Sequence, residues 1–255
     1  MTEPLLTALD DGVLTVTLNS PEDHNRMDRR MMTALYEAMD RADSDSAIRV
    51  LVITGAGDYF CAGGRVDGHP HGTLKQRQDY AQAYCLMQDR FGRLGVPVIA
   101  AVNGHCIAGG MSLMSFCDMA VAADHAEFGY PEVKYGQFPA LALAMLIPLA
   151  PPKRAFEMLY FGDRFSAATA LELNLVNRIA PKAELSSTVK SIVRTLKNRN
   201  QTAIGMGRRA YYAMTPMTPA SRLQYAQQFL TTLLQSTDGF VPAASEDDRI
   251  GAGKG

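Results

Sequence analysis

The sequence lacks several features that point to particular classes of protein. It contains no tryptophan and no apolar stretch long enough to span a bilayer. Its 25 basic and 26 acidic residues leave a net charge of -1, which gives no indication of nucleic-acid binding or of attachment to an anionic membrane. The N-terminal segment has no basic region followed by an apolar run, so no secretory signal is predicted and we expect a cytoplasmic protein.

Common metal and cofactor motifs are also missing. The four cysteines form no CxxC pair, which favours free thiols over disulfides or a zinc site. His69 and His71 lie in a Gly/Pro loop with no second cluster of ligands, so no metal is expected. No P-loop, HExxH or GxSxG motif occurs, and Phe60 stands where a dinucleotide fingerprint beginning at Gly55 requires a small residue. We therefore expect no metal and no redox cofactor.

The apolar residues that are present predict an α/β chain. Alternation over 14–18 predicts a half-buried strand, in a hairpin with a strand over 5–9. Continuous apolar runs predict three buried strands, over 50–54, 96–102 and 119–123. The strand–helix–strand order favours crossover connections and a parallel sheet.

Helical spacing of apolar residues predicts the remaining elements. Helices are expected over 28–42, with Asp28 as the N-cap, and over 74–93. The region 185–234 is typical of two or three amphipathic helices. The polar, glycine-containing tail after residue 240 is expected to fray.

Two of the predicted strands run into glycine-rich loops. The first loop contains Ala62-Gly63-Gly64-Arg65, and the second contains Ala108-Gly109-Gly110 before an apolar helix-like stretch over 111–116. Glycine allows backbone amides to approach a ligand closely, and an amide at a helix N-terminus carries the positive end of the helix dipole. Two such amides that converge on one point make an oxyanion hole, whereas either loop alone is more simply a turn.

Spaced motifs in the chain resemble those of the enoyl-CoA hydratase/isomerase (crotonase) superfamily. The resemblance covers about residues 12–180, in the correct order. It rests on these segments: Asn19-Ser20-Pro21 with Asn25; Phe60-Cys61-Ala62-Gly63-Gly64; Val102-Asn103-Gly104 with Gly109-Gly110 and Cys117-Asp118; Phe128-Gly129-Tyr130-Pro131-Glu132 with Gly136; Gly162; and Ala170 to Asn177.

The resemblance implies a crotonase-like (ClpP/crotonase) spiral of ββα units. It places the acyl-CoA-binding core in residues 1–195 and a helical oligomerisation region in 196–240, followed by a tail over 241–255. A homotrimer or a dimer of trimers is implied. Coenzyme A enters as part of the thioester substrate, so no separate cofactor is implied.

The resemblance also assigns site residues. The backbone amides of Gly64 and Gly109 occupy the oxyanion positions, and Glu132 occupies the position of a catalytic acid/base. Residues expected along the coenzyme A and acyl path are Asn25, Arg26, Ala62, Gly63, Arg65 and Ser112. Members of the family that hydrate a double bond use a second glutamate, and Ser112 stands in its place here.

Two further departures concern the binding of coenzyme A. Arg65 replaces a common aspartate, and the acidic segment 245–249 stands where many members carry a Phe-x-x-Lys-Arg stretch that contacts the phosphates. The main hypothesis is therefore an enzyme of hydratase or isomerase type with a single catalytic glutamate. Alternatives are a non-catalytic acyl-CoA-binding homologue, or a hydratase-lyase or hydrolase acting on a coenzyme A thioester.

Overall fold

Six strands form the larger of two sheets in the computed structural model, which describes residues 3–65 and 73–237. In spatial order they are β1 (Leu5–Asp10), β2 (Val13–Leu18), β3 (Val50–Gly55), β5 (Val98–Val102), β7 (Met119–Ala123) and β10 (Arg178–Ala180). The hairpin β1–β2 is antiparallel and every other pair is parallel, which confirms the predicted hairpin and parallel sheet. The predicted loop around His69 and His71 and the predicted tail fall outside the described residues.

A smaller, four-stranded sheet holds the segments that follow the long strands. Its strands are β4 (Tyr59–Cys61), β6 (His105–Ile107), β8 (Glu127–Gly129) and β9 (Phe165–Ser166). β4 follows β3, β6 follows β5 and β8 follows β7, and a helix comes after each pair. The chain therefore repeats a ββα unit, and successive units place equivalent loops side by side.

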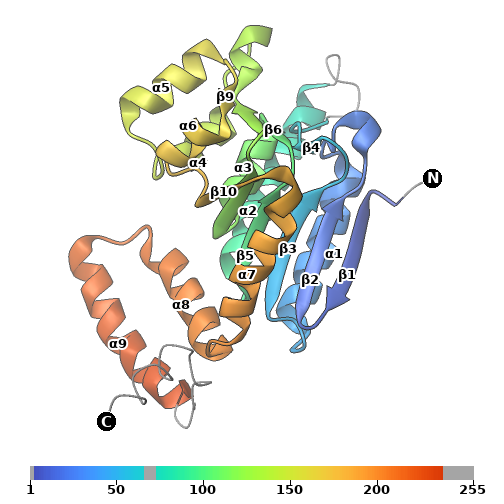
Figure 1. The fold of residues 1–255 in the computed structure, drawn as a ribbon. Helices are drawn as coiled ribbons and strands as arrows, with labels where there is room; N and C mark the ends of the chain where they lie inside the picture. Colours follow the sequence, from blue (N-terminus) through green and yellow to red (C-terminus); the bar gives the residue numbers. More distant parts are fainter. Residues whose placement is uncertain (1–2, 66–72, 238–255) are drawn as a thin grey trace, which may run out of the picture.

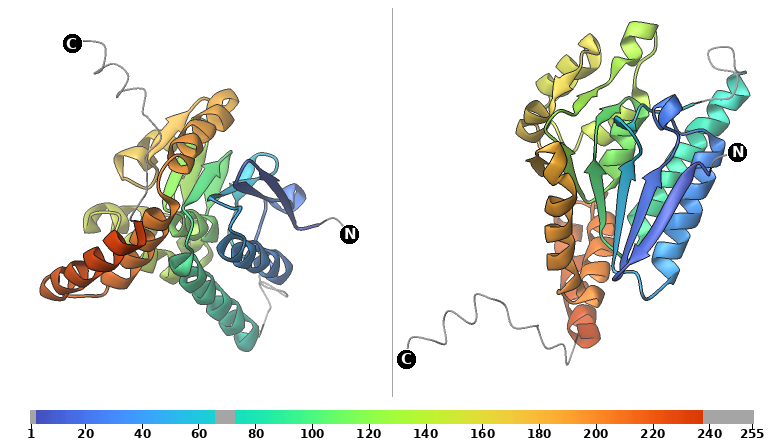
Figure 2. Two further views of the ribbon diagram at one scale, coloured as in Figure 1. Left: turned by 90° about the horizontal axis from the view of Figure 1, so that it is seen from below. Right: turned by 45° about the vertical axis from the view of Figure 1, so that its right-hand side comes forward.

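Helices cover both faces of the larger sheet, as Figures 1 and 2 show. On one face, α1 (Arg29–Ser44) and α2 (Leu74–Arg93) pack on the inward side chains of the strands in the main core. On the other face, α7 (Leu185–Lys197) packs on the alternate residues, such as Val52 and Val121. The central strands β3, β5 and β7 are buried on both faces, which explains their continuous apolar sequence.

Local capping fixes where the two long helices begin. The Asp28 carboxylate accepts a hydrogen bond from the amide of Met31 at 2.8 Å, which confirms Asp28 as the N-cap of α1. Thr73 and Gln76 form a reciprocal capping box at the start of α2. α2 begins and ends at the residues that the sequence predicted.

The remaining helices are short or lie at the C-terminal end. α3 (Gly109–Phe116) and α6 (Ala167–Glu172) pack against strands, whereas α4 (Ala140–Leu146) packs on α3 and α5 (Pro152–Phe161) packs on the 3-10 helix over Pro131–Tyr135. α8 (Gln201–Met214) and α9 (Pro219–Thr237) form a hairpin that projects from the sheets (Figure 1). With α7 they make three helices in the region where two or three were predicted. Within residues 3–65 and 73–237, no helix is both long and apolar enough to cross a membrane.

Candidate active site

The two predicted glycine loops touch each other. β4 and β6 pair in parallel, with Cys61 opposite Cys106, so the chain leaves both strands at the same edge. A Cβ atom on Gly63 would lie 2.9 Å from the backbone nitrogen of Gly109, and a Cβ atom on Gly109 would lie 3.3 Å from that of Gly64. Only glycine allows the backbones to come this close.

Two amide groups at this contact are available as donors. Gly109 is the first residue of α3, so its N–H has no partner within the helix. Gly64 lies between two backbone hydrogen bonds, from Met27 to the Gly63 carbonyl at 2.8 Å and from Arg65 to the Met27 carbonyl at 2.9 Å. In the part of the chain that the structure describes, the N–H groups of Gly64 and Gly109 donate no hydrogen bond.

Ala108 makes the turn from β6 into α3 with an unusual backbone. Its φ is 53° and its ψ is -125°, a backbone conformation that residues other than glycine rarely adopt. Its amide donates to the Gly129 carbonyl at 2.8 Å, which ties this turn to the end of β8. Such strain costs about 1–3 kcal/mol and persists only where the surroundings impose it.

Glu132 lies just beyond that end of β8, in a 3-10 helix over Pro131–Tyr135. Its Oε2 atom is buried and has no hydrogen-bond partner among the described residues. Burial raises the pKa of the carboxyl above its ordinary value, and the backbone N–H of Glu132 itself only partly offsets the rise. The structure thus holds a partly desolvated carboxyl group whose pKa is raised by burial.

Glu132 lies near the second glycine loop, because the Ala108 amide in that loop donates to the carbonyl of Gly129, three residues before Glu132. Tyr84 donates its hydroxyl to the Gly109 carbonyl, and the pKa of Tyr84 is raised chiefly by burial, with a contribution from the charge of Glu132. The pKa of Tyr130 is raised by burial, with a smaller contribution from Glu132. The parallel pairing of β6 with β8 explains the proximity, since the two strands end together.

Ser112 lies one turn into α3 and is 1% exposed. It shares a helix face with Gly109, three residues earlier. A buried hydroxyl next to the glycine loops is therefore present where a second carboxylate is absent.

The loop around Asn25 lies beside the first glycine loop, because the Ala62 amide donates to the His24 carbonyl at 3.0 Å. The Asn25 side chain is fully buried, and its hydrogen bonds are made within the protein. Its amide donates to the carbonyls of Ala56 and Tyr59 at 2.8 and 2.7 Å, and its oxygen accepts from the Ser20 amide at 2.9 Å. The whole residue is 0% exposed and its backbone amide donates to the Ser20 carbonyl at 2.9 Å, so Asn25 holds this loop in shape and does not face a ligand.

Two exposed arginines lie beside the Asn25 loop and the first glycine loop. Arg65 donates to the Asp23 carboxylate at 3.1 Å, and Arg26 lies 4.0 Å from the same group. The Asp23 carboxylate thus holds two guanidinium groups beside Ala62. Together Asp23, Arg26 and Arg65 carry a net positive charge, which suits an anionic ligand.

His105, in β6, is held by a backbone hydrogen bond. His105 accepts a hydrogen bond at Nδ1 from the Glu127 amide at 3.2 Å, and burial lowers its pKa. All four cysteines are free thiols. Among the described residues, no three His, Cys, Asp or Glu side chains gather as they would around a metal ion.

A hollow of about 670 Å³ lies elsewhere, between α2 and α8. Its charged lining is already paired: Arg93 with Asp89 at 2.9 Å, and Arg209 with Asp43 at 3.3 Å. It contains neither of the glycine loops nor Glu132. The free amides of Gly64 and Gly109 and the Glu132 carboxyl group lie at the glycine loops, so we place the candidate site there.

Comparison with known proteins agrees with this geometry. The model of the family described as enoyl-CoA hydratase/isomerase matches residues 8–240. A putative enoyl-CoA hydratase of Thermus thermophilus is 32% identical over 208 residues, which are 80% of this chain and 82% of the relative. A carnitinyl-CoA dehydratase of Salmonella typhi is 30% identical over 262 residues, with both chains covered completely.

Solved structures show the same fold. The crystal structure of an enoyl-CoA hydratase from Mycobacterium smegmatis superposes with a TM-score of 0.87 at 29% identity and covers 91% of both chains. That of human enoyl-CoA hydratase domain-containing protein 3 gives a TM-score of 0.85 at 26% identity and covers 98% of this chain and 95% of the human one. The fold is thus the crotonase spiral that the motifs implied, and the chain belongs to the enoyl-CoA hydratase/isomerase family and is an enzyme of that family.

Proposed function

We propose that this protein forms and reprotonates the enolate of an acyl-CoA thioester, with Glu132 as its single acid/base. The observation that carries the proposal is the buried, unpartnered Oε2 of Glu132 on the same side as the free amides of Gly64 and Gly109. The family of the chain supports a coenzyme A thioester as the substrate.

The thioester oxygen binds between the two amide groups. An α-proton next to a thioester is only weakly acidic, and negative charge develops on that oxygen as the proton leaves. Two fixed N–H donors stabilise this charge, and the loss of one such donor typically costs about 3–4 kcal/mol of barrier. The close approach of the Gly63–Gly64 and Ala108–Gly109 backbones supports this assignment.

Glu132 then moves the proton. A carboxylate whose Oε2 has no hydrogen-bond partner among the described residues and whose pKa is raised by burial is a stronger base than one in water. Because Ser112 lacks a carboxylate, only one acid is available, and the same group must both remove and return protons. This favours double-bond isomerisation, or hydration and cleavage with a single acid, over the two-glutamate hydration mechanism.

Arg26 and Arg65 are proposed to contact the phosphates of coenzyme A. Both are exposed and are held beside the Ala62–Gly63 loop by Asp23. They supply positive charge that the acidic segment 245–249 does not. The proposal requires no metal and no redox cofactor.

Proton exchange tests the assignment directly. A panel of acyl-CoA thioesters is incubated with the protein in heavy water and followed by mass spectrometry, with Glu132→Gln as the test and Glu157→Gln, an exposed glutamate paired with Arg154, as the matched control. We expect deuterium at the α-carbon with wild type and Glu157→Gln, and a loss of about 100-fold or more with Glu132→Gln.

A second candidate function is a non-catalytic acyl-CoA-binding protein, which the serine at position 112 favours. Thioesters that bind, as measured by calorimetry, yet show no exchange with any variant would establish it. Exchange that persists in Glu132→Gln would instead assign the proton transfer to another group.

A further inference from the structure

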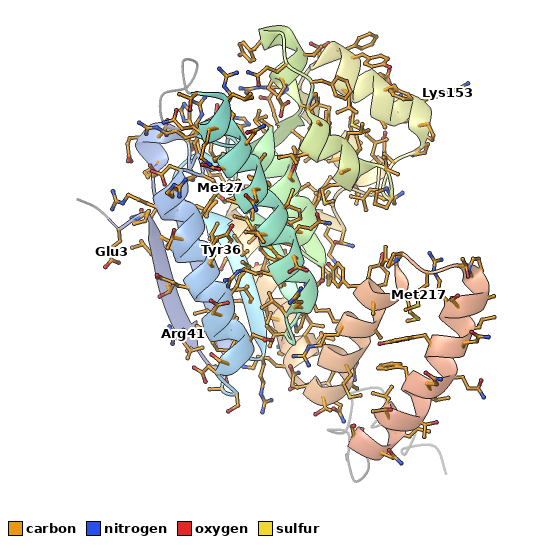
Figure 3. All side chains as sticks on the ribbon, turned by 180° about the vertical axis from the view of Figure 1, so that it is seen from behind. Glu3, Met27, Tyr36, Arg41, Lys153 and Met217 are labelled. Atoms are coloured by element: carbon orange, nitrogen blue, oxygen red, sulfur yellow. The ribbon has the colours of Figure 1, made fainter. Side chains whose placement is uncertain are left out.

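Two tyrosines of α2 face the glycine loops. Tyr80 and Tyr84 are four residues apart, so they share one face of the helix, and their ring centroids are 5.8 Å apart. Both hydroxyls reach the backbone or side chain of Met27, which precedes α1. Figure 3 shows α1 and α2 side by side with Met27 labelled.

Tyr84 is buried between Met27 and Gly109. It is 3% exposed, and its hydroxyl donates to the Gly109 carbonyl. The same oxygen lies 3.9 Å from Sδ of Met27 and would be 2.9 Å from a Cβ atom on Gly109. The ring packs 5.9 Å from that of Phe116 at the other end of α3. Tyr84 therefore fixes the first turn of α3, and with it the amide of Gly109.

Tyr80 lies over Gly64. Its hydroxyl donates to the Met27 carbonyl at 3.0 Å, and the ring is only half-buried. A Cβ atom on Gly64 would lie 2.6 Å from Cζ of Tyr80 and closer still to the hydroxyl oxygen. The phenol thus occupies the space that a side chain at position 64 would fill, while Gly64 itself is exposed.

We propose that Tyr80 is the wall of the acyl subsite that limits the size of the acyl group, and that Tyr84 is a positioning residue for Gly109. This inference rests on the proposed function, since a thioester oxygen at the Gly64 amide brings the acyl carbons beside the Tyr80 phenol. The hydroxyl already donates to Met27, so the ring is held in place. A fixed ring favours small, unbranched acyl groups and excludes those with a methyl or phenyl group on C3.

Substrate ratios test the role of Tyr80. The kcat/KM of α-proton exchange is measured for butanoyl-CoA, 3-methylbutanoyl-CoA and 3-phenylpropanoyl-CoA in wild type, Tyr80→Ala and Tyr80→Leu. We expect the ratio of a bulky to a small substrate to rise about 10-fold or more in both variants, the scale at which pocket size discriminates acyl groups. An unchanged ratio in folded variants would overturn the proposal.

The role of Tyr84 is tested with a matched control. Tyr36 of α1 donates its hydroxyl to the Ala83 carbonyl of α2 at 2.5 Å, so Tyr36→Phe removes the same kind of bond away from the glycines (Figure 3). We expect Tyr84→Phe to lower kcat about 10-fold with little change in KM, and Tyr36→Phe to change neither. Equal effects of the two variants would make Tyr84 merely structural.

A stability measurement separates this inference from the proposed function. Gly64→Ala is expected to lower Tm in wild type because of the Tyr80 phenol, and to lower it less in the Tyr80→Ala background. This coupling needs no substrate. If the two substitutions are coupled in Tm but no thioester exchanges its α-proton, the contact between Tyr80 and Gly64 stands, and both the proposed chemistry and the acyl subsite are overturned. If α-protons exchange but the substrate ratios stay unchanged in the Tyr80 variants, only the role of Tyr80 as the wall of the acyl subsite is overturned.

Discussion

Arg208 of α8 and Asp118, just before β7, form an ion pair that joins the C-terminal helices to the larger sheet. Nε of Arg208 lies 3.0 and 2.8 Å from the two carboxylate oxygens, and Nη1 donates to the Leu94 carbonyl at 3.0 Å. Asp118 also accepts from the Val98 amide at 2.7 Å. The Arg208 side chain is 6% exposed, so solvent screens this pair weakly.

Removal of Arg208 is expected to loosen α8. Arg208→Ala leaves Asp118 partly buried without its partner, and we expect the free energy of unfolding to fall by about 3 kcal/mol. The control is Arg209→Ala, because Arg209 is exposed and its pair with Asp43 at 3.3 Å should contribute less than about 1 kcal/mol. Urea denaturation measures both variants, and equal losses would contradict the difference in burial.

Ala108 offers a stabilising substitution at the candidate site. Ala108→Gly relieves a backbone strain of about 1–3 kcal/mol, and the extra freedom of glycine in the unfolded chain costs about 0.5–1 kcal/mol. We expect a net gain of about 1 kcal/mol. Ala144→Gly, in the exposed part of α4, should instead lose about 1 kcal/mol. A loss of stability in both variants would show that the turn is not strained.

The long elements were predictable from the sequence because many residues contribute to each pattern. The bounds of α2 and β7 agree with the predicted 74–93 and 119–123. The three-residue strands β4, β6 and β8 are too short to show a period, although they carry the loops of the site. Without the family resemblance, nothing local would have joined Gly64, Gly109 and Glu132.

Contacts between distant residues were the least predictable part. Asp118 pairs with Arg208, 90 residues later, and sequence spacing gives no indication of this contact. The contact of Tyr80 with Gly64 depends equally on how α2 crosses the loops. The trimer or dimer of trimers, the division at residues 195 and 240 and the cytoplasmic location stay predictions.

Glu132 is expected to reduce stability at neutral pH. Its pKa is higher in the folded than in the unfolded chain, so the ionised form is disfavoured by folding. Stability should therefore be lost as the pH rises through the folded-state pKa. Glu132→Gln should raise Tm at pH 7–8, and the gain should vanish below the ordinary value of 4.5. Thermal scans across pH measure this, with Glu157→Gln as the control; a gain that does not depend on pH would contradict it.

The pH dependence of proton exchange should report the same carboxyl. Exchange requires ionised Glu132, so kcat/KM is expected to rise with pH through an apparent pKa above 4.5. Desolvation of the carboxylate is the cause of the rise in pKa. Any residual exchange in Glu132→Gln should not show this rise of kcat/KM with pH. A midpoint at or below 4.5 would mean that the group responsible is exposed to solvent.

Ser112 tests whether one acid is enough. If Glu132 alone moves the α-proton, Ser112→Ala should slow exchange far less than the ~100-fold loss typical of a missing acid/base. Ser115→Ala is the control, because its hydroxyl bonds the Met111 carbonyl at 2.8 Å within the same helix. Hydration of crotonyl-CoA gives the second readout. A loss of hydration with exchange intact would assign Ser112 to holding the attacking water, whereas a 100-fold loss of exchange would make the serine part of the proton transfer.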